Sequence, residues 1–398
     1  MAEPAAEGLP ARQQLLRVMN EQLLLAHIRQ AGEVSRAELA RMSSLSKPTV
    51  SLALANLERA GLVRTSGART GVPGPAAILY QVRPEAGFVL GLDVGSRFLR
   101  GAISDLSGTV RVRSSVKVRA TSAHRLVAEL VGLARNLYAD AGLKPDTITQ
   151  TVLGSPGVYD PRRDTLALSG ALPGWEKPAV LAELRRAFGP SLMIENDVDA
   201  AALAERDHGH GRDVDSFAFV SVGTGIGMGL VLNGKLHRGA HGAAGEIGYL
   251  PLSSGTVDAE DARRRGSLEA AASAAGIVRA ARRAGMRGSV SARRVFEAAD
   301  KGDTGAGQVI ADTAELVAKA VCAVVTVVDP DLIVLGGGIG QAAGFLDKVA
   351  HEVKGLAPVL PELRVSALGP DAVVDGCLVG GLDRAWQLVT AAMPAPTA

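Results

Sequence analysis

One predicted helix near the N-terminus carries side chains whose types and spacing suit the reading of double-stranded DNA. Ser46 marks its start, because a serine oxygen can accept a hydrogen bond from a free first-turn amide, and that turn also tolerates Pro48. Apolar residues at helical spacing predict its inner face: Val50, Leu54 and Leu57. The outer face is small and polar, which suits the major groove, and consists of Lys47, Thr49, Ser51, Ala53 and Asn56. We expect DNA contacts from Ser46, Lys47, Thr49, Ser51 and Asn56.

The residues before this helix favour a helix-turn-helix. Ser35 and Glu38 have the spacing of a capping box, in which each side chain bonds the other's backbone amide, so a first helix begins there. Residues 42–45 then form the turn. A preceding helix over 13–31 is predicted from apolar residues on one face: Leu16, Met19, Leu23 and Ala26. The alternative is an ordinary helical hairpin packed on a larger domain.

A β-hairpin is predicted after the second helix. Strands are expected over 62–66 and 78–82, and a loop over 67–77 joins them. Three helices followed by such a hairpin make a winged helix, in which Arg64 and Arg69 are placed to touch phosphates or the minor groove. The first 85 residues hold ten Lys and Arg against seven Asp and Glu, which is weakly basic for one DNA-binding domain. We therefore expect two copies to share the binding in a dimer.

The whole chain has the composition of a soluble globular protein with two or three domains. It has 398 residues, of which 47% are hydrophobic and 21% charged, and its net charge of +2 identifies no partner. Cys322 and Cys377 lie in apolar segments, which favours buried reduced thiols, with a disulfide between them as the alternative. The first residues, MAEPAAEG, lack the apolar core of a signal peptide, and no run reaches the ~20 apolar residues that span a bilayer. We expect a cytoplasmic protein with no membrane partner.

A larger domain begins after Arg83 and Pro84, and its pattern indicates an internal duplication. Its first half opens with strands over 88–93 and 98–105, and a similar hairpin restarts over 216–232, which predicts two halves around a central cleft. Glycine-rich hairpin tips let backbone amides approach phosphate oxygens closely, because no Cβ intervenes. These candidate nucleotide-binding residues are Asp93, Gly95, Gly223, Thr224, Gly225, Gly337 and Gly338.

Motifs spread along the chain resemble the ROK family (repressors, open reading frames, kinases), in its regulator branch. They occur in the order SRAELA…SKPTVS, GSPGVYD, LPGW, ENDVDAAALAE, VGTGIGMGLVLNGKL, RGAHGAAGEIG and GSLE. The resemblance covers residues 13–387 and implies an α/β protein: a winged helix-turn-helix followed by a duplicated actin/hexokinase-like (ribonuclease H-like) domain. We expect the winged helix over 13–83 and the ROK domain, for effector binding and dimerisation, over 84–390, with flexible ends over 1–12 and 391–398.

The resemblance implies roles for residues around a sugar site. In kinases of the family the aspartate of a Glu-Asn-Asp motif, here Asp197, takes the proton from the sugar hydroxyl that attacks the γ-phosphate. Asn196 is placed to hydrogen bond to adjacent hydroxyls, and Gly157 brings its backbone close to the ring. The expected effector-binding residues are Gly157, Asn196, Asp197, Glu246, Tyr249 and Glu269. The alternative is that Asn196 and Asp197 only cap the helix predicted over 198–206.

The chain departs from the family's kinases at the phosphate and metal sites. The usual Asp-x-Gly-Gly-Thr turn reads Asp93-Val94-Gly95-Ser96-Arg97, so a bulky cation crowds the turn that ATP requires. Tyr249 replaces the histidine of the family's zinc site, Ser267 replaces its last cysteine, and DAEDARRRGS replaces the cysteine run. We therefore expect no zinc and no other cofactor. Asp197 and the nucleotide-binding residues are interpreted as vestigial for phosphoryl transfer.

The expected function is a transcriptional regulator, a repressor of carbohydrate-related genes. Its partners would be a DNA operator, a carbohydrate effector and further copies of itself, as a homodimer or homotetramer. An active sugar kinase with an appended DNA-binding domain is the main alternative. A nicotinamide enzyme is another, because Gly338, Gly340 and Ala343 follow a strand at dinucleotide-binding spacing. The acidic partner would then be Glu362. A dinucleotide site needs this residue at the end of a strand, whereas Glu362 precedes a strand predicted over 364–367.

Overall fold

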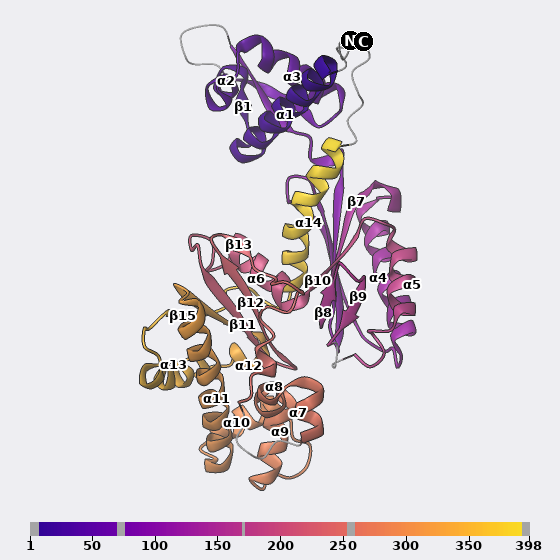
Figure 1. Cartoon of the computed structure of the whole chain (residues 1–398). Coiled ribbons are helices and arrows are strands. Elements are labelled where there is room, and N and C mark those ends of the chain that lie inside the picture. The colour runs from indigo at the N-terminus through magenta and orange to yellow at the C-terminus, as the bar shows by residue number, and fades with distance from the viewer. Residues whose placement is uncertain (1–7, 70–75, 169–171, 253–258, 392–398) are drawn as a thin grey trace, which may run out of the picture.

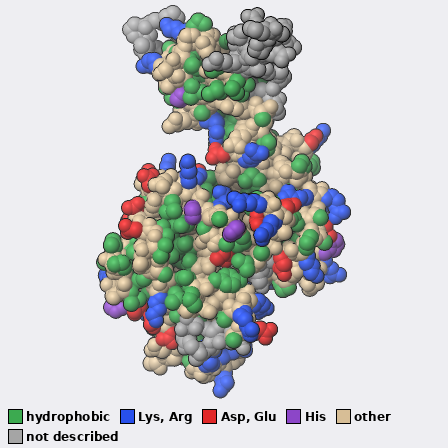
Figure 2. All heavy atoms as spheres, in the orientation of Figure 1, with side chains coloured by type: hydrophobic (Ala, Val, Ile, Leu, Met, Phe, Trp, Pro, Cys, Tyr) green, Lys and Arg blue, Asp and Glu red, His purple; other side chains and the backbone are tan. Residues whose placement is uncertain are grey.

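The computed structural model describes residues 8–69, 76–168, 172–252 and 259–391, and it consists of a winged helix above two α/β lobes (Figure 1). In the space-filling view the winged helix stands clear of the lobes and joins them through a narrow neck (Figure 2). No helix within these described ranges is long and apolar enough to cross a membrane.

The N-terminal part is the expected winged helix. Its helices are α1 (Gly8–Ala31), α2 (Arg36–Ser43) and α3 (Lys47–Arg59), and its strands are β1 (Val34–Ser35), β2 (Val63–Arg69) and β3 (Ala77–Val82), in the order β1-β3-β2. The capping box is confirmed: the Ser35 Oγ accepts from the Glu38 amide at 3.3 Å, and the Ser35 amide donates to Glu38 Oε2 at 2.8 Å. Ser46 caps α3 by accepting from the Thr49 amide at 3.3 Å. Residues 70–75 of the predicted loop lie outside the described residues.

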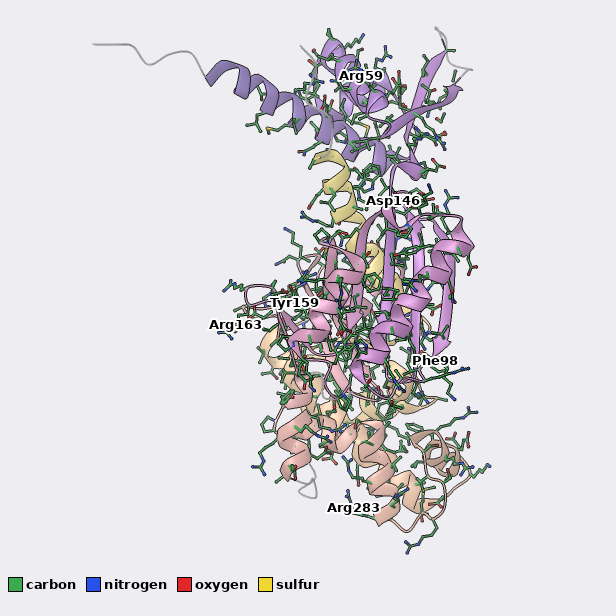
Figure 3. The ribbon with its side chains drawn as sticks, turned by 90° about the vertical axis from the view of Figure 1, so that its right-hand side faces the viewer. Arg59, Phe98, Asp146, Tyr159, Arg163 and Arg283 are labelled. Carbon is green, nitrogen blue, oxygen red and sulfur yellow. The ribbon has the colours of Figure 1, made fainter. Side chains whose placement is uncertain are left out.

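The prediction for the inner face of α1 is wrong. Leu16 and Met19 are 53% and 54% exposed, and Leu23 and Ala26 are exposed as well. The residues that pack against the rest of the domain are Leu24, Leu25 and Ile28. The N-terminal half of α1 projects sideways beyond the domain (Figure 3), which leaves Leu16 and Met19 without neighbours to bury against. Leu23 and Ala26 lie on the exposed side of the C-terminal half, beside the buried residues.

The first lobe is built on a five-stranded sheet in the order β10-β7-β4-β5-β6. Its strands are β4 (Phe88–Val94), β5 (Phe98–Asp105), β6 (Val110–Lys117), β7 (Ile148–Ser155) and β10 (Leu192–Asn196). β4, β5 and β6 are antiparallel neighbours, whereas β7 is parallel to β4 and β10 is parallel to β7. The lobe also contains α4 (Ala123–Ala141), α5 (Pro178–Phe188), the hairpin of β8 (Val158–Asp160) and β9 (Thr165–Ala167), and the short helices η1 (Pro84–Ala86) and η2 (Pro145–Thr147).

The second lobe repeats this pattern, which confirms the duplication. Its sheet runs in the order β13-β12-β11-β14-β15, with three antiparallel strands followed by two parallel ones. The strands are β11 (Phe217–Val222), β12 (Ile226–Leu232), β13 (Lys235–Leu236), β14 (Leu332–Gly336) and β15 (Glu362–Val365). Its helices are η3 (Ile247–Tyr249), α7 (Ala259–Arg265), α8 (Ser267–Ala272), α9 (Ala274–Arg283), α10 (Ala292–Asp300), α11 (Thr304–Val328), α12 (Gly337–Gly340) and α13 (Phe345–Leu356).

Two helices lie between the parts of the molecule. α6 (Asp197–His208) follows β10 and packs against β12 of the other lobe and against α14 (Ala372–Ala391). The contact between α6 and α14 is close: a Cβ built on Gly376 would lie 1.6 Å from the Ala200 carbonyl oxygen. Glycine is therefore required at position 376 for these two helices to approach as they do.

The C-terminal helix α14 joins the winged helix to the first lobe. It packs on β4 and β7, and its far end reaches α1 (Figure 1). One hydrophobic cluster contains Leu24 and Ile28 of α1 together with Leu378, Ala385 and Trp386 of α14. The winged helix and the ROK domain thus share a core. The two cysteines are free thiols: Cys377 of α14 is buried and Cys322 of α11 is half-buried.

Candidate DNA-reading helix and interlobe cleft

The outer surface of α3 carries both polar and apolar side chains. Lys47 is exposed and Ser51 is half-buried, as expected for this face. The hydroxyls of Ser46 and Thr49 lie 2.8 Å apart and hydrogen bond to each other. Part of their hydrogen-bonding capacity is therefore used within the helix cap. The prediction selected polar side chains and therefore missed two exposed apolar residues, Leu52 and Ala55.

Asn56 and Ala53 are buried, contrary to the prediction that they lie on the outer face of α3. Asn56 is only 5% exposed, and its Nδ2 donates to Glu21 Oε1 of α1 at 2.7 Å. The same Glu21 oxygen accepts from Arg17 Nε at 2.9 Å, and Arg59 Nη1 donates to Asn56 Oδ1 at 3.2 Å. The prediction put Asn56 on the outer face because its side chain is polar. A buried amide is nevertheless stable where its hydrogen bonds are satisfied. The bond between Asn56 and Glu21 joins α3 to α1.

The wing arginines are both paired with carboxylates of the same chain. Arg69 Nη1 lies 2.8 Å from Glu38 Oε1, and Arg64 Nη1 lies 3.6 Å from Glu85 Oε2. Hydrogen bonds from the Ser35 side chain and amide, with a further one from Arg69, lower the pKa of Glu38 to about 2. About half of each arginine side chain remains exposed, so a phosphate can compete for it.

A cleft of about 1220 Å³ lies between the two lobes. Every residue that the sequence predicted for effector or nucleotide binding lines it: Asp93, Gly95, Gly157, Asn196, Asp197, Gly223, Thr224, Gly225, Glu246, Tyr249, Glu269, Gly337 and Gly338. The first lobe contributes the ends of β4 and β10, and the second lobe contributes the β11–β12 turn and the start of α12.

Asn196 caps α6, as the alternative interpretation held, and it still lines the cleft. Its Oδ1 accepts from the amides of Val198 and Asp199 at 2.8 and 3.0 Å. Its Nδ2 donates to the Gly157 carbonyl at 3.0 Å, which ties β10 to the loop after β7. One amide proton of Asn196 remains for a ligand, so the predicted pair of bonds to adjacent hydroxyls reduces to one.

Four carboxyl groups surround the inner part of the cleft: Asp93, Asp197, Glu246 and Glu269. Burial raises the pKa of each, and the charge of Asp197 adds to the effect at the other three. The pKa of Glu246 is raised to about 7 by burial and by the charges of Asp197 and Glu269. Glu269 is oriented by the Ile226 amide, which donates to its Oε2 at 2.9 Å. Such a site is rich in hydrogen-bond acceptors.

Charged residues that the sequence analysis missed surround this cluster. Arg100 Nη1 donates to Asp93 Oδ2 at 3.1 Å, and this partly offsets the burial that raises the pKa of Asp93 to about 7. Asp199 is buried, and burial together with the charge of Glu195 raises its pKa to about 8. Arg238 forms an ion pair with Glu195 beside it. Asp199 could have been found from its position in ENDVDAA, one helical turn from the cap.

The glycine turns at the cleft have backbone conformations that a side chain would disturb. The Gly95 amide donates to the Phe98 carbonyl at 3.1 Å, and a Cβ at Gly95 would lie 2.9 Å from that oxygen. Gly337 has a φ of +77°, and a Cβ there would lie 2.4 Å from the Val222 carbonyl oxygen. Arg97 is exposed in the β4–β5 turn and lines the cleft.

The glycines after β14 do not form a dinucleotide site with Glu362. They begin α12 at the C-terminal end of β14, whereas Glu362 pairs in register with Leu332 at the opposite end of that strand. Glu362 is engaged by Arg364 in an ion pair. The acidic partner that a ribose would need therefore lies at the opposite end of the parallel strands from the glycines.

Ion pairs hold the segment that replaces the family's cysteine run. Asp261 of α7 contacts Arg265 Nε at 2.7 Å and Arg279 Nη2 of α9 at 2.9 Å. The Tyr249 hydroxyl donates to the Arg264 carbonyl at 3.1 Å, which fastens the same helix to η3. Asp261 therefore connects α7 to α9 where the family uses a metal.

The start of α14 borders the cleft and is anchored by charges. Val373 lines the cleft, and Asp371, just before the helix, lies 3.7 Å from Arg100 Nε and 3.2 Å from Arg113 Nη1. Arg113 also contacts Asp375 at 2.5 Å. Because Arg100 bonds Asp93 as well, the cleft carboxylates and the first turn of α14 belong to one charge network.

Comparison with known proteins agrees with this architecture. The model of the ROK family matches residues 89–368, and that of the MarR family matches residues 20–71. The chain belongs to the ROK family. The xylose repressor of Caldicellulosiruptor bescii is 25% identical over 384 residues, covering 92% of this chain and 95% of the repressor.

Two solved structures show which parts of this ROK protein have counterparts. The first is a ROK family transcriptional regulator, a homolog of the Escherichia coli Mlc protein. The match covers 94% of this chain and 99% of that regulator, with a TM-score of 0.75 at 24% identity, and it supports the fold. The ROK hexokinase of Thermus thermophilus covers 75% of this chain and 99% of its own, with a TM-score of 0.64 at 28% identity. The two regulators cover 92% and 94% of this chain, whereas the hexokinase covers 75%.

Proposed function

We propose that this ROK protein is a DNA-binding repressor of carbohydrate genes, controlled by a sugar-type effector in the interlobe cleft. The observation that carries the proposal is the course of α14, which borders the cleft at Val373 and shares a core with α1 at Trp386. An effector that binds one arrangement of the two lobes better than another shifts the population, and α14 moves with it. The orientation of the winged helix changes accordingly.

The cleft carboxylates support a polyhydroxylated effector. Asp197, Glu246 and Glu269 are acceptors, and ring hydroxyls are donors that can satisfy them. Recognition through buried polar groups is selective, because an analogue that lacks a hydroxyl leaves its partner unpaired. The name of the xylose repressor supports the same class of effector for this chain.

The DNA-reading surface supports a symmetric assembly. Lys47, Thr49 and Ser51 of α3 would contact bases, and Arg64 and Arg69 of the wing would contact phosphates. A winged helix with a charge excess of only three holds a single half-site weakly. A homodimer or homotetramer that places two copies of α3 on neighbouring half-sites multiplies the affinity.

A sugar kinase with a DNA-binding domain is the second candidate function. The observation in its favour is that Asp197 persists at the cleft with a pKa raised by burial, as suits a general base. Arg97 in the β4–β5 turn opposes it, because a long cationic side chain occupies the place of the small residues of the kinase motif.

One set of measurements separates the two functions. Gel-shift titration with the DNA upstream of the protein's own operon, repeated with a panel of sugars, measures operator release, and a coupled assay measures ATP consumption with the same sugars. For the repressor we expect sugar-dependent release without turnover, and Asp197→Asn should bind DNA but respond less to sugar. Asp140→Asn, on the exposed face of α4, is the matched control. ATP turnover at ~1–100 s⁻¹ that Asp197→Asn abolishes would establish the kinase instead.

A further inference from the structure

The outer side of α3 carries an apolar stripe. Leu52 is 59% exposed, and Pro48 and Ala55 are exposed beside it. These residues stand four and three positions apart, a spacing that places them in one row along a helix. Lys47 is exposed at the start of this face and Arg59 at its end, so a basic residue lies at either end of the stripe.

The packing of α3 holds this stripe outward. Val50, Leu54 and Leu57 fill the core on one side, and Asn56 is bonded to buried Glu21 on another. Rotation of α3 that buried Leu52 would break the bond between Asn56 and Glu21 and expose the core leucines. Leu52 is therefore fixed in the surface that contains Lys47 and Ser51.

A leucine at this position can discriminate only one feature of the major groove. Guanine, cytosine and adenine present donors and acceptors there, which Leu52 cannot bond, whereas thymine presents a C5-methyl group. The polar side chains beside Leu52 are suited to the neighbouring bases.

We propose that Leu52, supported by Pro48 and Ala55, packs against the C5-methyl group of a thymine in each half-site of the operator. The inference rests on the proposed function, because it requires specific DNA binding through α3. It adds to that function which base is recognised in each half-site and which residue recognises it.

Replacement of thymine by deoxyuridine tests this contact, because it removes the methyl group and keeps every hydrogen-bonding group. Full-length protein is titrated against operators in which single thymines are replaced in turn. We expect one position in each half-site at which affinity falls about fourfold, which corresponds to ~0.8 kcal/mol for one buried carbon. Leu52→Ala should bind the unmodified operator more weakly and should lose this penalty at that position alone.

Leu356→Ala, at a leucine of α13 in the ROK domain that is 49% exposed, is the matched control and should keep the parent's thymine profile. The inference is overturned if no deoxyuridine weakens binding, or if Leu52→Ala retains the full penalty. A change in oligomeric state of Leu52→Ala by sedimentation, with an unaltered thymine profile, would assign the stripe to a second copy of the chain. Failure of the parent to bind any operator would refute the proposed function itself.

Discussion

The guanidinium carbon of Arg29 lies 5.0 Å from the ring centroid of Trp386, so the last turns of α1 and α14 are joined by a cation–π contact. Arg29 Nη2 also donates to Asp383 Oδ1 at 3.1 Å, and Trp386 Nε1 donates to the Leu106 carbonyl at 3.0 Å. Arg29 thus contacts two residues that stand three positions apart on one face of α14. This contact joins α14, whose first turn borders the cleft, to the winged helix.

Arg29→Ala should weaken the coupling between sugar binding in the cleft and operator binding by the winged helix. We expect operator affinity without effector within a few-fold of the parent, because the lost cation–π contact contributes only about 0.5–1 kcal/mol. Release of the operator by sugar should weaken, since α14 no longer holds α1 firmly. Gel shifts with and without sugar measure both quantities, and Arg125→Ala, on the exposed side of α4, is the control. A full sugar response in Arg29→Ala would show that coupling takes another route.

Asn56→Ala should act on stability and leave base selectivity intact. The substitution leaves the buried Glu21 carboxylate without one of its donors, which costs about 1–3 kcal/mol of unfolding free energy. Chemical denaturation measures this loss, and competition among operator variants measures selectivity. Ser51→Ala is the control, because it lies on the outer face and should show the reverse pattern. A changed order of preference among operator bases in Asn56→Ala would place this residue at the DNA after all.

Stability should fall as pH rises from about 5 to 8. Burial, with the charge of Asp197, raises the pKa of both Asp93 and Glu246 to about 7, well above their values in an unfolded chain. In this range the folded protein holds protons that the unfolded chain has released, so raising the pH favours unfolding. The slope is at most about 1.4 kcal/mol per pH unit for each group.

Denaturation curves measured across this pH range check the direction. Glu246→Gln should flatten the profile, because an amide does not titrate, while Asp140→Asn should leave it unchanged. Sugar affinity should rise over the same range, since ionised carboxylates are the better acceptors. A parent protein whose stability increases from pH 5 to 8 would contradict the assignment.

The purified protein should contain no stoichiometric zinc, because Tyr249 and Ser267 stand at ligand positions and Asp261 organises the segment through arginines. Elemental analysis after dialysis measures the metal content. Asp261→Asn should increase hydrogen exchange over 259–265 and lower sugar affinity, whereas Glu297→Gln, in the exposed ion pair with Arg293, should do neither. One zinc per chain that survives dialysis would overturn the prediction.

Local signals in the sequence predicted much of the fold. Ser35, Glu38 and Ser46 define helix starts through bonds that span three residues, and the glycine turns depend on steric limits of the backbone alone. The motifs around Asn196 and Glu246 predicted which residues line the cleft. The strand pattern, which both lobes repeat, predicted that the cleft lies between two halves.

The errors arise where distant segments decide the outcome. Asn56 is buried because Glu21, 35 residues earlier, offers it a partner, and nothing near Asn56 in the sequence reveals this. The inner face of α1 is set by α3, α2 and β3, which follow it in the chain and against which Leu24 and Ile28 pack. Charge networks such as Arg100 with Asp93 and Asp371 likewise depend on the assembled sheet.

The shared core between α1 and α14 limits how such a protein can be recombined. A chimera cut at the junction near Pro84 would place a foreign winged helix on a surface shaped by Leu378, Ala385 and Trp386. An exchange that succeeds has to transfer the C-terminal helix together with the N-terminal domain. New pairings of operator and sugar are therefore easier to obtain by altering single residues of α3 or of the cleft than by exchanging whole domains.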